Sequence, residues 1–188
     1  MKAFLTPLQG LAEFEQIKEK SKTNKGILQV SGCMESQKSH LMYGLSGIAP
    51  YRLILAEDER RAREIYEDYR FYDRKVYSYP AKDLLFFQAD IHGNLLICQR
   101  MKVIKALLEE KELTVVTSID GCMDFLESLE KIKEQLIHYE SDSTVDTEQL
   151  KNQLVALGYE RVGQVEMPGQ FSVRGGIVDI YCLTEENP

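Results

Sequence analysis

Short apolar runs that alternate with helical stretches are the feature that most constrains how this 188-residue chain can fold. The runs have the length and composition of strands and lie at residues 27–30, 51–56, 76–79 and 113–117. The stretches between them have the apolar spacing of helices and lie at residues 38–44, 57–71 and 94–110. Because strands that alternate with helices form βαβ units, residues 27–125 are expected to fold as an α/β domain with a parallel sheet and flanking helices.

A different pattern follows after about residue 130. Residues 140–146 are polar and linker-like, residues 147–157 have helical spacing, and residues 158–181 contain short strands separated by tight turns. We therefore predict a first domain at 1–126, a connecting region at 127–145 and a small α+β domain with antiparallel hairpins at 146–188. The small part is thin for an independent core, which indicates that it either leans on the first domain or is truncated.

The last predicted strand divides its side chains between two faces. An apolar face, expected to be buried, carries Val178, Ile180 and Cys182. The opposite face carries Ile177, Asp179 and Tyr181. This leaves Tyr181 on the more open face, near Arg174. An arginine and an aromatic side chain on small, rigid strands are typical of a docking surface.

Charge is distributed unevenly along the chain, whose net charge is −7. Residues 1–75 carry 13 Lys/Arg and 11 Asp/Glu, whereas residues 76–188 carry 10 and 19, a balance of −9. Because a general nucleic-acid surface needs a basic stripe, the second half of the chain argues against direct DNA binding.

Two arginines stand out in this acidic half. After Lys151 the basic residues are Arg161 and Arg174, and both lie in the stretch of predicted hairpins. They are either specific contacts to a partner or ordinary surface ion pairs, for example with Glu160 or Glu166.

Residues 32–39 have the position and spacing of a phosphate-binding loop, G-x-x-x-x-G-K-[ST], in which backbone N–H groups and a lysine hold phosphates. Three positions match this pattern: Gly32, Lys38 and Ser39. Gln37 replaces the second glycine, and Glu35 adds a negative charge where a triphosphate would lie. We therefore expect a former phosphate loop that is kept as a scaffold and does not bind ATP productively. Weak nucleotide binding and nucleotide hydrolysis are the alternatives.

No metal site, disulfide or membrane span is expected. Asp120, the nearest candidate for a metal-binding acid, is expected to be the N-cap of a short helix instead. Four dispersed cysteines without a C-x-x-C spacing are typical of buried, reduced thiols in a cytosolic protein: Cys33, Cys98, Cys122 and Cys182. The sequence contains no run of about 18 apolar residues.

Three segments resemble proteins of nucleotide excision repair. Residues 79–87 (YPAKDLLFF) resemble the Y-P-x-x-D-x-L-P-Y segment of the helicase UvrB and of the transcription-repair coupling factors (Mfd). Residues 168–180 (PGQFSVRGGIVDI) resemble their P-G-x-F-x-x-R-G-x-x-x-D-[IV] hairpin. The strand, loop and helix at 27–46 occupy the place of the phosphate loop that functions in UvrB and is lost in the coupling factors.

The departures from UvrB favour the second of these families. Gln37 and Glu35 argue against ATP binding, and the segment between Gln88 and Asn94 is too short for the DNA-clamping hairpin of UvrB. The chain therefore resembles the N-terminal UvrB-homology module of the coupling-factor family. A further segment that completes the sheet in that family is absent, so we expect a fragment. A UvrB-type, ATP-dependent helicase domain with an active phosphate loop is the alternative.

This resemblance implies a RecA-like first domain without ATPase activity and a second domain that binds UvrA. It implies that Arg161, Arg174 and Tyr181 contact UvrA, with Tyr181 at a position where phenylalanine is usual. It further implies a bacterial, cytoplasmic adaptor that recruits UvrA to stalled RNA polymerase in transcription-coupled DNA repair. ATP and Mg²⁺ would be used by the C-terminal motor of the full-length protein.

Overall fold

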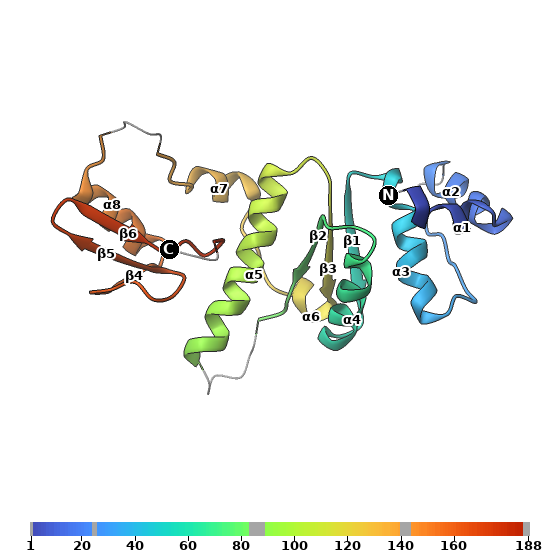
Figure 1. The fold of residues 1–188 in the computed structure, drawn as a ribbon, viewed down its shortest axis with the longest axis horizontal. Helices are drawn as coiled ribbons and strands as arrows, with labels where there is room; N and C mark the ends of the chain where they lie inside the picture. The colour runs from blue at the N-terminus through green and yellow to red at the C-terminus, as the bar shows by residue number, and fades with distance from the viewer. Residues whose placement is uncertain (1, 24–25, 83–88, 140–143, 186–188) are drawn as a thin grey trace. The chain divides into compact units, whose positions relative to one another are not determined.

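The computed structural model describes residues 2–23, 26–82, 89–139 and 144–185 and divides the chain into two compact units (Figure 1). Unit 1 comprises residues 1–81 and 109–124, and unit 2 comprises residues 82–108 and 125–188. Each unit contains one three-stranded sheet.

The elements of unit 1 are η1 (Lys2–Phe4), α1 (Thr6–Gln9), α2 (Ala12–Thr23), α3 (Glu35–Gly44), η2 (Ser46–Ile48), β1 (Tyr51–Ala56), α4 (Glu59–Arg70), β2 (Val76–Tyr79), β3 (Leu113–Ser118) and α6 (Ile119–Cys122). The elements of unit 2 are α5 (Ala89–Glu109, except for its last residue), α7 (Leu129–Glu134), α8 (Thr147–Ala156), β4 (Glu160–Arg161), β5 (Gln170–Arg174) and β6 (Ile177–Ile180).

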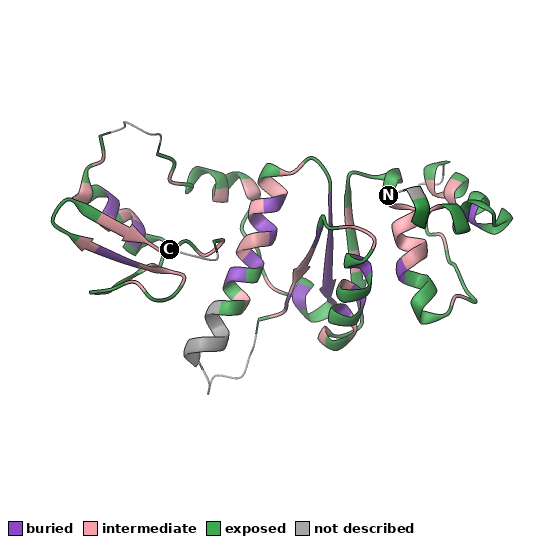
Figure 2. Cartoon of the chain, viewed as in Figure 1, coloured by how far each residue is buried: buried purple, intermediate pink, exposed green. Residues whose placement is uncertain are grey.

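The sheet of unit 1 is parallel and has the strand order β1-β3-β2. Both outer strands pair with β3, so that Leu53 and Tyr77 lie on either side of Val115. Every residue of β3 is buried (Figure 2). Helix α4 packs on one face of the sheet. The helix and the sheet share a buried core that consists of Ala56, Ala62, Ile65, Tyr69, Val76 and Val116. The predicted α/β class, with a parallel sheet and strands at 51–56, 76–79 and 113–117, is confirmed.

The strand predicted at 27–30 is wrong, because residues 26–34 contain no helix or strand. Ile27 is 96% exposed and Val30 is 41% exposed. A short apolar run becomes a strand when its backbone pairs with a neighbour and its side chains are buried, and the described residues provide this run with neither. A phosphate-loop fold has a strand directly before the loop. The RecA-like architecture is therefore not confirmed.

Ser118, and not Asp120, caps the short helix α6. Its hydroxyl accepts a hydrogen bond from the N–H of Gly121 at 3.0 Å, because Ser118 has the extended backbone of an N-cap and Asp120 is already helical. The same hydroxyl donates to the carboxylate of Glu59, which also accepts from the N–H of Ala81 at 3.0 Å. A carboxylate of α4 thus joins the chain just beyond β2 to the end of β3.

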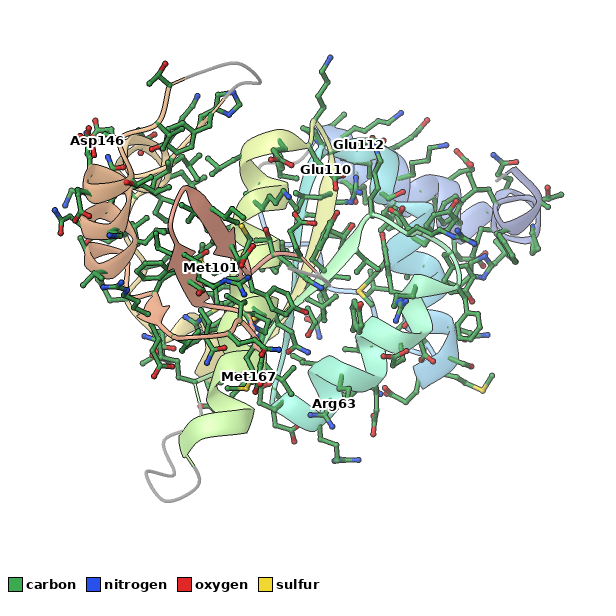
Figure 3. All side chains as sticks on the ribbon, turned by 60° about the vertical axis from the view of Figure 1, so that its left-hand side comes forward. Arg63, Met101, Glu110, Glu112, Asp146 and Met167 are labelled. Carbon is green, nitrogen blue, oxygen red and sulfur yellow. The ribbon has the colours of Figure 1, made fainter. Side chains whose placement is uncertain are left out.

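The sheet of unit 2 is mixed and has the order β4-β5-β6. The N-cap of helix α8 is Asp146 (Figure 3), whose carboxylate accepts from the N–H groups of Glu148 and Gln149 at 2.9 and 3.2 Å. Helix α8 and strand β5 share a buried core of Leu150, Leu154 and Phe171. Partly buried residues pack against this core: Ile137, Val145, Tyr159, Val173, Val178 and Ile180.

The prediction of antiparallel hairpins is correct for β5 and β6 but wrong for β4, which runs parallel to β5. The connection from β4 crosses back before β5 begins, and side chains of β5 hold it in place. The Gln170 amide oxygen accepts from the N–H groups of Glu166 and Met167, both at 3.0 Å, and the Ser172 hydroxyl donates to the carbonyl of Gly163 at 3.0 Å.

Two predicted segments lie partly outside the described residues. These are the motif at 79–87, of which residues 83–88 are not described, and the polar stretch at 140–146, of which residues 140–143 are not described. After the first gap, α5 begins at Ala89, earlier than the helix predicted from residue 94.

Candidate protein-docking site

The antiparallel pairing of β5 and β6 places side chains on two faces. The face toward α8 carries Phe171, Val173, Val178 and Ile180. On the other face, Arg174 lies opposite Ile177 and Ser172 lies opposite Asp179. We call the residues Arg174, Ile177, Asp179 and Tyr181 the hairpin face. The prediction that Val178 and Ile180 face the core is confirmed.

Arg174 lies at the end of β5, directly before the turn. Its side chain is 64% exposed, and its Nη2 donates to Oδ2 of Asp179 at 2.5 Å. Gly175 has a φ of +62°, which favours glycine, and a Cβ at Gly175 or at Gly176 would meet no atom within 4 Å. The space beside Gly175 and Gly176 in this turn is therefore open.

Ile177 lies opposite Arg174, and Tyr181 lies at the other end of the hairpin face. Ile177 is 63% exposed, which is unusual for an isoleucine in a strand. Tyr181 is half-buried, and its backbone N–H donates to the carbonyl of Gln170 at 2.9 Å. Its own carbonyl accepts from the N–H of Gly169 at 2.8 Å. These bonds continue the ladder beyond β6 and fix the backbone of Tyr181.

Arg161 lies on the outer strand β4 and faces the other way. It is in register with Phe171, and residues in register on parallel strands point to the same face, which here is the face toward α8. The neighbouring pair supports this register, since the Gln170 amide donates to the Glu160 carboxylate at 3.4 Å. Arg161 is exposed, and its side chain has no hydrogen bond or ion pair with the described part of the chain.

The structure thus brings Arg174 and Tyr181 to one face and leaves Arg161 on the other. The hairpin face also contains Ile177 and Asp179, which sequence reasoning did not name as site residues. Alternation along the strand already placed both on the open face with Tyr181. The exposure of Ile177 and the ion pair of Asp179 needed the tertiary structure.

Side chains of the loop at 32–39 form contacts within the loop and with α4. The Gln37 amide oxygen accepts from the N–H of Met34, the N-cap of α3, at 3.1 Å. The Glu35 carboxylate forms ion pairs with Lys38, on the same helix, and with Arg61 of α4. Ser39 is buried at 2% exposure, and Gly32 has a φ of +86°. The side chains of Gln37, Lys38 and Ser39 are therefore engaged in contacts or buried.

The four cysteines are free thiols, but Cys98 alone is buried. Cys33 is half-buried, and Cys122 and Cys182 are exposed, so the expectation that all four are buried is wrong. Cys182 lies outside the core because β6 ends at Ile180 and the chain then turns. Burial raises the pKa of the Cys98 thiol and keeps it protonated. Among the described residues, no group of three or more His, Cys, Asp or Glu side chains is placed to hold a metal ion.

Comparison with known proteins first gives the class of the small unit. Residues 137–188 match the family described as the UvrB interaction domain. This segment begins before α8 and includes α8, the whole mixed sheet and the hairpin face. The small unit is therefore similar to the UvrB interaction domain.

Most of the chain is similar to the transcription-repair-coupling factors. It is 32% identical to the transcription-repair-coupling factor of Bacillus subtilis (strain 168) over 174 residues, which cover 85% of this chain and 15% of the relative. The same protein of Staphylococcus haemolyticus is 31% identical over 109 residues, covering 58% of this chain and 9% of the relative. That of Staphylococcus aureus (strain bovine RF122 / ET3-1) is 30% identical over 112 residues, covering 60% and 10%. The chain thus spans 15% or less of the length of these relatives.

None of the helices in the described ranges is both long enough and apolar enough to cross a bilayer.

Proposed function

We propose that the small unit docks the excision-repair protein UvrA and that the chain acts as a non-catalytic adaptor in transcription-coupled repair. One observation carries this proposal: the exposed hairpin face lies inside the segment that matches the UvrB interaction domain. The resemblance to UvrB and to the coupling factors points to UvrA as the partner.

The chemistry of the hairpin face suits a protein partner. Arg174 offers a planar guanidinium that can bind a carboxylate through two N–H groups, which a lysine cannot reproduce. Ile177 adds exposed apolar surface beside it, and Tyr181 adds a ring with a polar tip. An arginine with apolar and aromatic neighbours is the usual composition of an interface hot spot. We therefore assign the central contacts to Arg174 and Tyr181.

Arg161 has a peripheral role in this proposal. Because it leaves the sheet on the face toward α8, a partner seated on the hairpin face has to reach around the edge strand β4 to meet it. Peripheral charges affect association more than they affect the strength of the complex. We therefore expect a smaller loss of affinity for Arg161→Ala than for Arg174→Ala.

The absence of catalysis is part of the proposal, and the loop at 32–39 supports it. Gln37 takes a backbone donor of the helix terminus, and Glu35 neutralises Lys38. Productive ATP binding would require both interactions to break. We accordingly propose that unit 1 is a scaffold, RecA-like in ancestry, and that ATP and Mg²⁺ act at the motor of a longer protein. In that protein, the adaptor would bring UvrA to an RNA polymerase stalled at DNA damage.

The test is the affinity of this chain for purified UvrA, measured by calorimetry and by pull-down. We expect Arg174→Ala to weaken binding about 30-fold, as for a hot-spot arginine. Thermal stability should change little, because an exposed ion pair contributes about 0–1 kcal/mol.

Arg60→Ala is the matched control, since Arg60 is also an exposed arginine with a carboxylate partner, Glu64, at 3.0 Å. Its binding to UvrA should equal that of the unmodified chain. Normal binding by Arg174→Ala, or loss of its fold, would show that the hairpin face is not the docking site.

A further inference from the structure

We propose that Asp179 is a positioning residue that holds the Arg174 guanidinium in the orientation in which it meets a carboxylate of the partner. This inference rests on the proposed docking function and adds a residue to its site. It starts from the ion pair across the hairpin, where Nη2 of Arg174 lies 2.5 Å from Oδ2 of Asp179.

Asp179 is well placed to act as a fixed support. It lies inside β6, opposite Ser172, which is 1% exposed at the centre of the small sheet. Its own side chain is 38% exposed, against 64% for Arg174, so the acid is the more restrained member of the pair. The pair is diagonal across the hairpin, since Arg174 is in register with Ile177 and not with Asp179. Asp179 therefore draws the arginine side chain along the hairpin face toward the middle of β6.

The contact also leaves most of the guanidinium available. Arginine carries five N–H donors, and the described residues engage Arg174 through Nη2. The turn at Gly175 and Gly176 places no side chain beside it. A partner carboxylate can therefore bind the remaining N–H groups without displacing Asp179.

Two opposing effects decide the sign of the contribution. The charge of Asp179 weakens the attraction of the face for an acidic partner, but at an exposed site water screens much of this effect. In return, the ion pair restrains a long side chain before binding and so reduces the entropy lost when the partner arrives. Because the acid consumes one donor and leaves the others free, we expect the restraint to prevail.

The experiment measures the affinity for purified UvrA of the unmodified chain and of three variants: Asp179→Asn, Asp179→Ala and Asp179→Glu. We expect Asp179→Asn and Asp179→Ala to weaken binding about three- to tenfold, the range for one side chain that is no longer restrained. Asp179→Glu keeps a carboxylate and should lie nearer to the unmodified chain. Asp179→Asn has the same shape as aspartate, so a folded variant is available even if Asp179→Ala unfolds.

A double-mutant cycle separates positioning from direct contact. In the Arg174→Ala background, where binding is weaker but still measurable, Asp179→Asn should have no further effect, because nothing remains for it to position. Tighter or unchanged binding by Asp179→Asn in the native background would overturn the proposal. So would additive losses in the cycle, which would mean that Asp179 touches the partner itself. Normal binding by Arg174→Ala, in contrast, would refute the docking function as a whole.

Discussion

Lys38 and Arg174 are both held by a carboxylate, but with different consequences. Lys38 pairs with Glu35 three residues earlier on the same helix, and Arg61 of α4 binds the same carboxylate. The carboxylate of Glu35 is therefore shared by two basic side chains. Arg174 instead pairs across two strands at an open face, through one nitrogen. At the scale of the residue, the two basic side chains differ in how far their carboxylate partners leave them available to a ligand.

Ile177 provides a prediction at this scale. We expect Ile177→Asp to weaken binding to UvrA roughly tenfold or more, because it removes exposed apolar surface and adds an acid opposite Arg174. Stability should hold, since Ile177 is 63% exposed. Ile27→Asp, at an isoleucine that is 96% exposed in unit 1, is the matched control. Equal affinities of the two variants in calorimetry would remove Ile177 from the site.

Tyr77 provides a second prediction, for the stability of unit 1 in alkali. Burial, followed by a hydrogen bond to the Glu110 carboxylate, raises the pKa of Tyr77 to about 12. An unfolded tyrosine has a pKa of about 10. As the pH rises above about 10, the unfolded state loses this proton first, so stability is lost between about pH 10 and about pH 12.

Urea unfolding of the unmodified chain and of Tyr77→Phe at about pH 9 and about pH 11 measures this effect. The variant should lose less stability over that interval, because it has no proton to release. Equal losses in the two proteins would show that Tyr77 does not retain its proton in the folded state.

At the scale of elements, the cap of α3 occupies a backbone N–H group in the loop at 32–39. Helix α3 begins at Glu35 after its N-cap Met34, and the side chain of Gln37 satisfies the N–H of Met34. A phosphate would need such N–H groups free at the start of the helix. The substitution that removes the second glycine of the loop thus also supplies the cap. This arrangement supports the proposal that the loop serves as a scaffold.

This capping predicts the outcome of a nucleotide titration. We expect no micromolar binding of a fluorescent ATP analogue in the presence of Mg²⁺, and we expect Lys38→Ala to leave the signal unchanged. The measurement is fluorescence anisotropy against nucleotide concentration. Micromolar binding that disappears in Lys38→Ala would contradict the scaffold interpretation and support a UvrB-type ATPase.

At the scale of the whole molecule, charge limits the choice of partner. The chain has a net charge of −7, and residues 76–188 carry nearly twice as many acidic as basic residues, 19 against 10. Isolated basic groups such as Arg174 are in an acidic setting, which favours specific contacts over general attraction to a polyanion. The chain spans 15% or less of the length of the coupling factors that it resembles.

A gel-shift assay with duplex DNA tests this inference. At moderate ionic strength we expect no complex, because the acidic excess of residues 76–188 argues against a basic stripe that releases counterions from DNA. A shift that weakens steeply with added salt would indicate an electrostatic DNA site and would revive a nucleic-acid function for the chain.

The sequence by itself determined the parallel sheet of unit 1, most helix positions and the two faces of the last strand. Local periodicity carries this information, since strands 51–56, 76–79 and 113–117 and the alternation through Val178 and Ile180 depend on which side chains have to be buried. It also indicated, by Gln37 and Glu35, that the loop at 32–39 differs from a working phosphate loop.

Pairing partners were decided by the tertiary structure alone. The run at 27–30 is apolar but pairs with no strand among the described residues. Strand β4 pairs parallel to β5, and the side chains of Gln170 and Ser172 bind the connection between them. The same parallel register turns Arg161 away from Arg174. Strand partners and ion pairs such as Arg174 with Asp179 join residues through space, and periodicity along the chain carries no record of which segment will lie beside which.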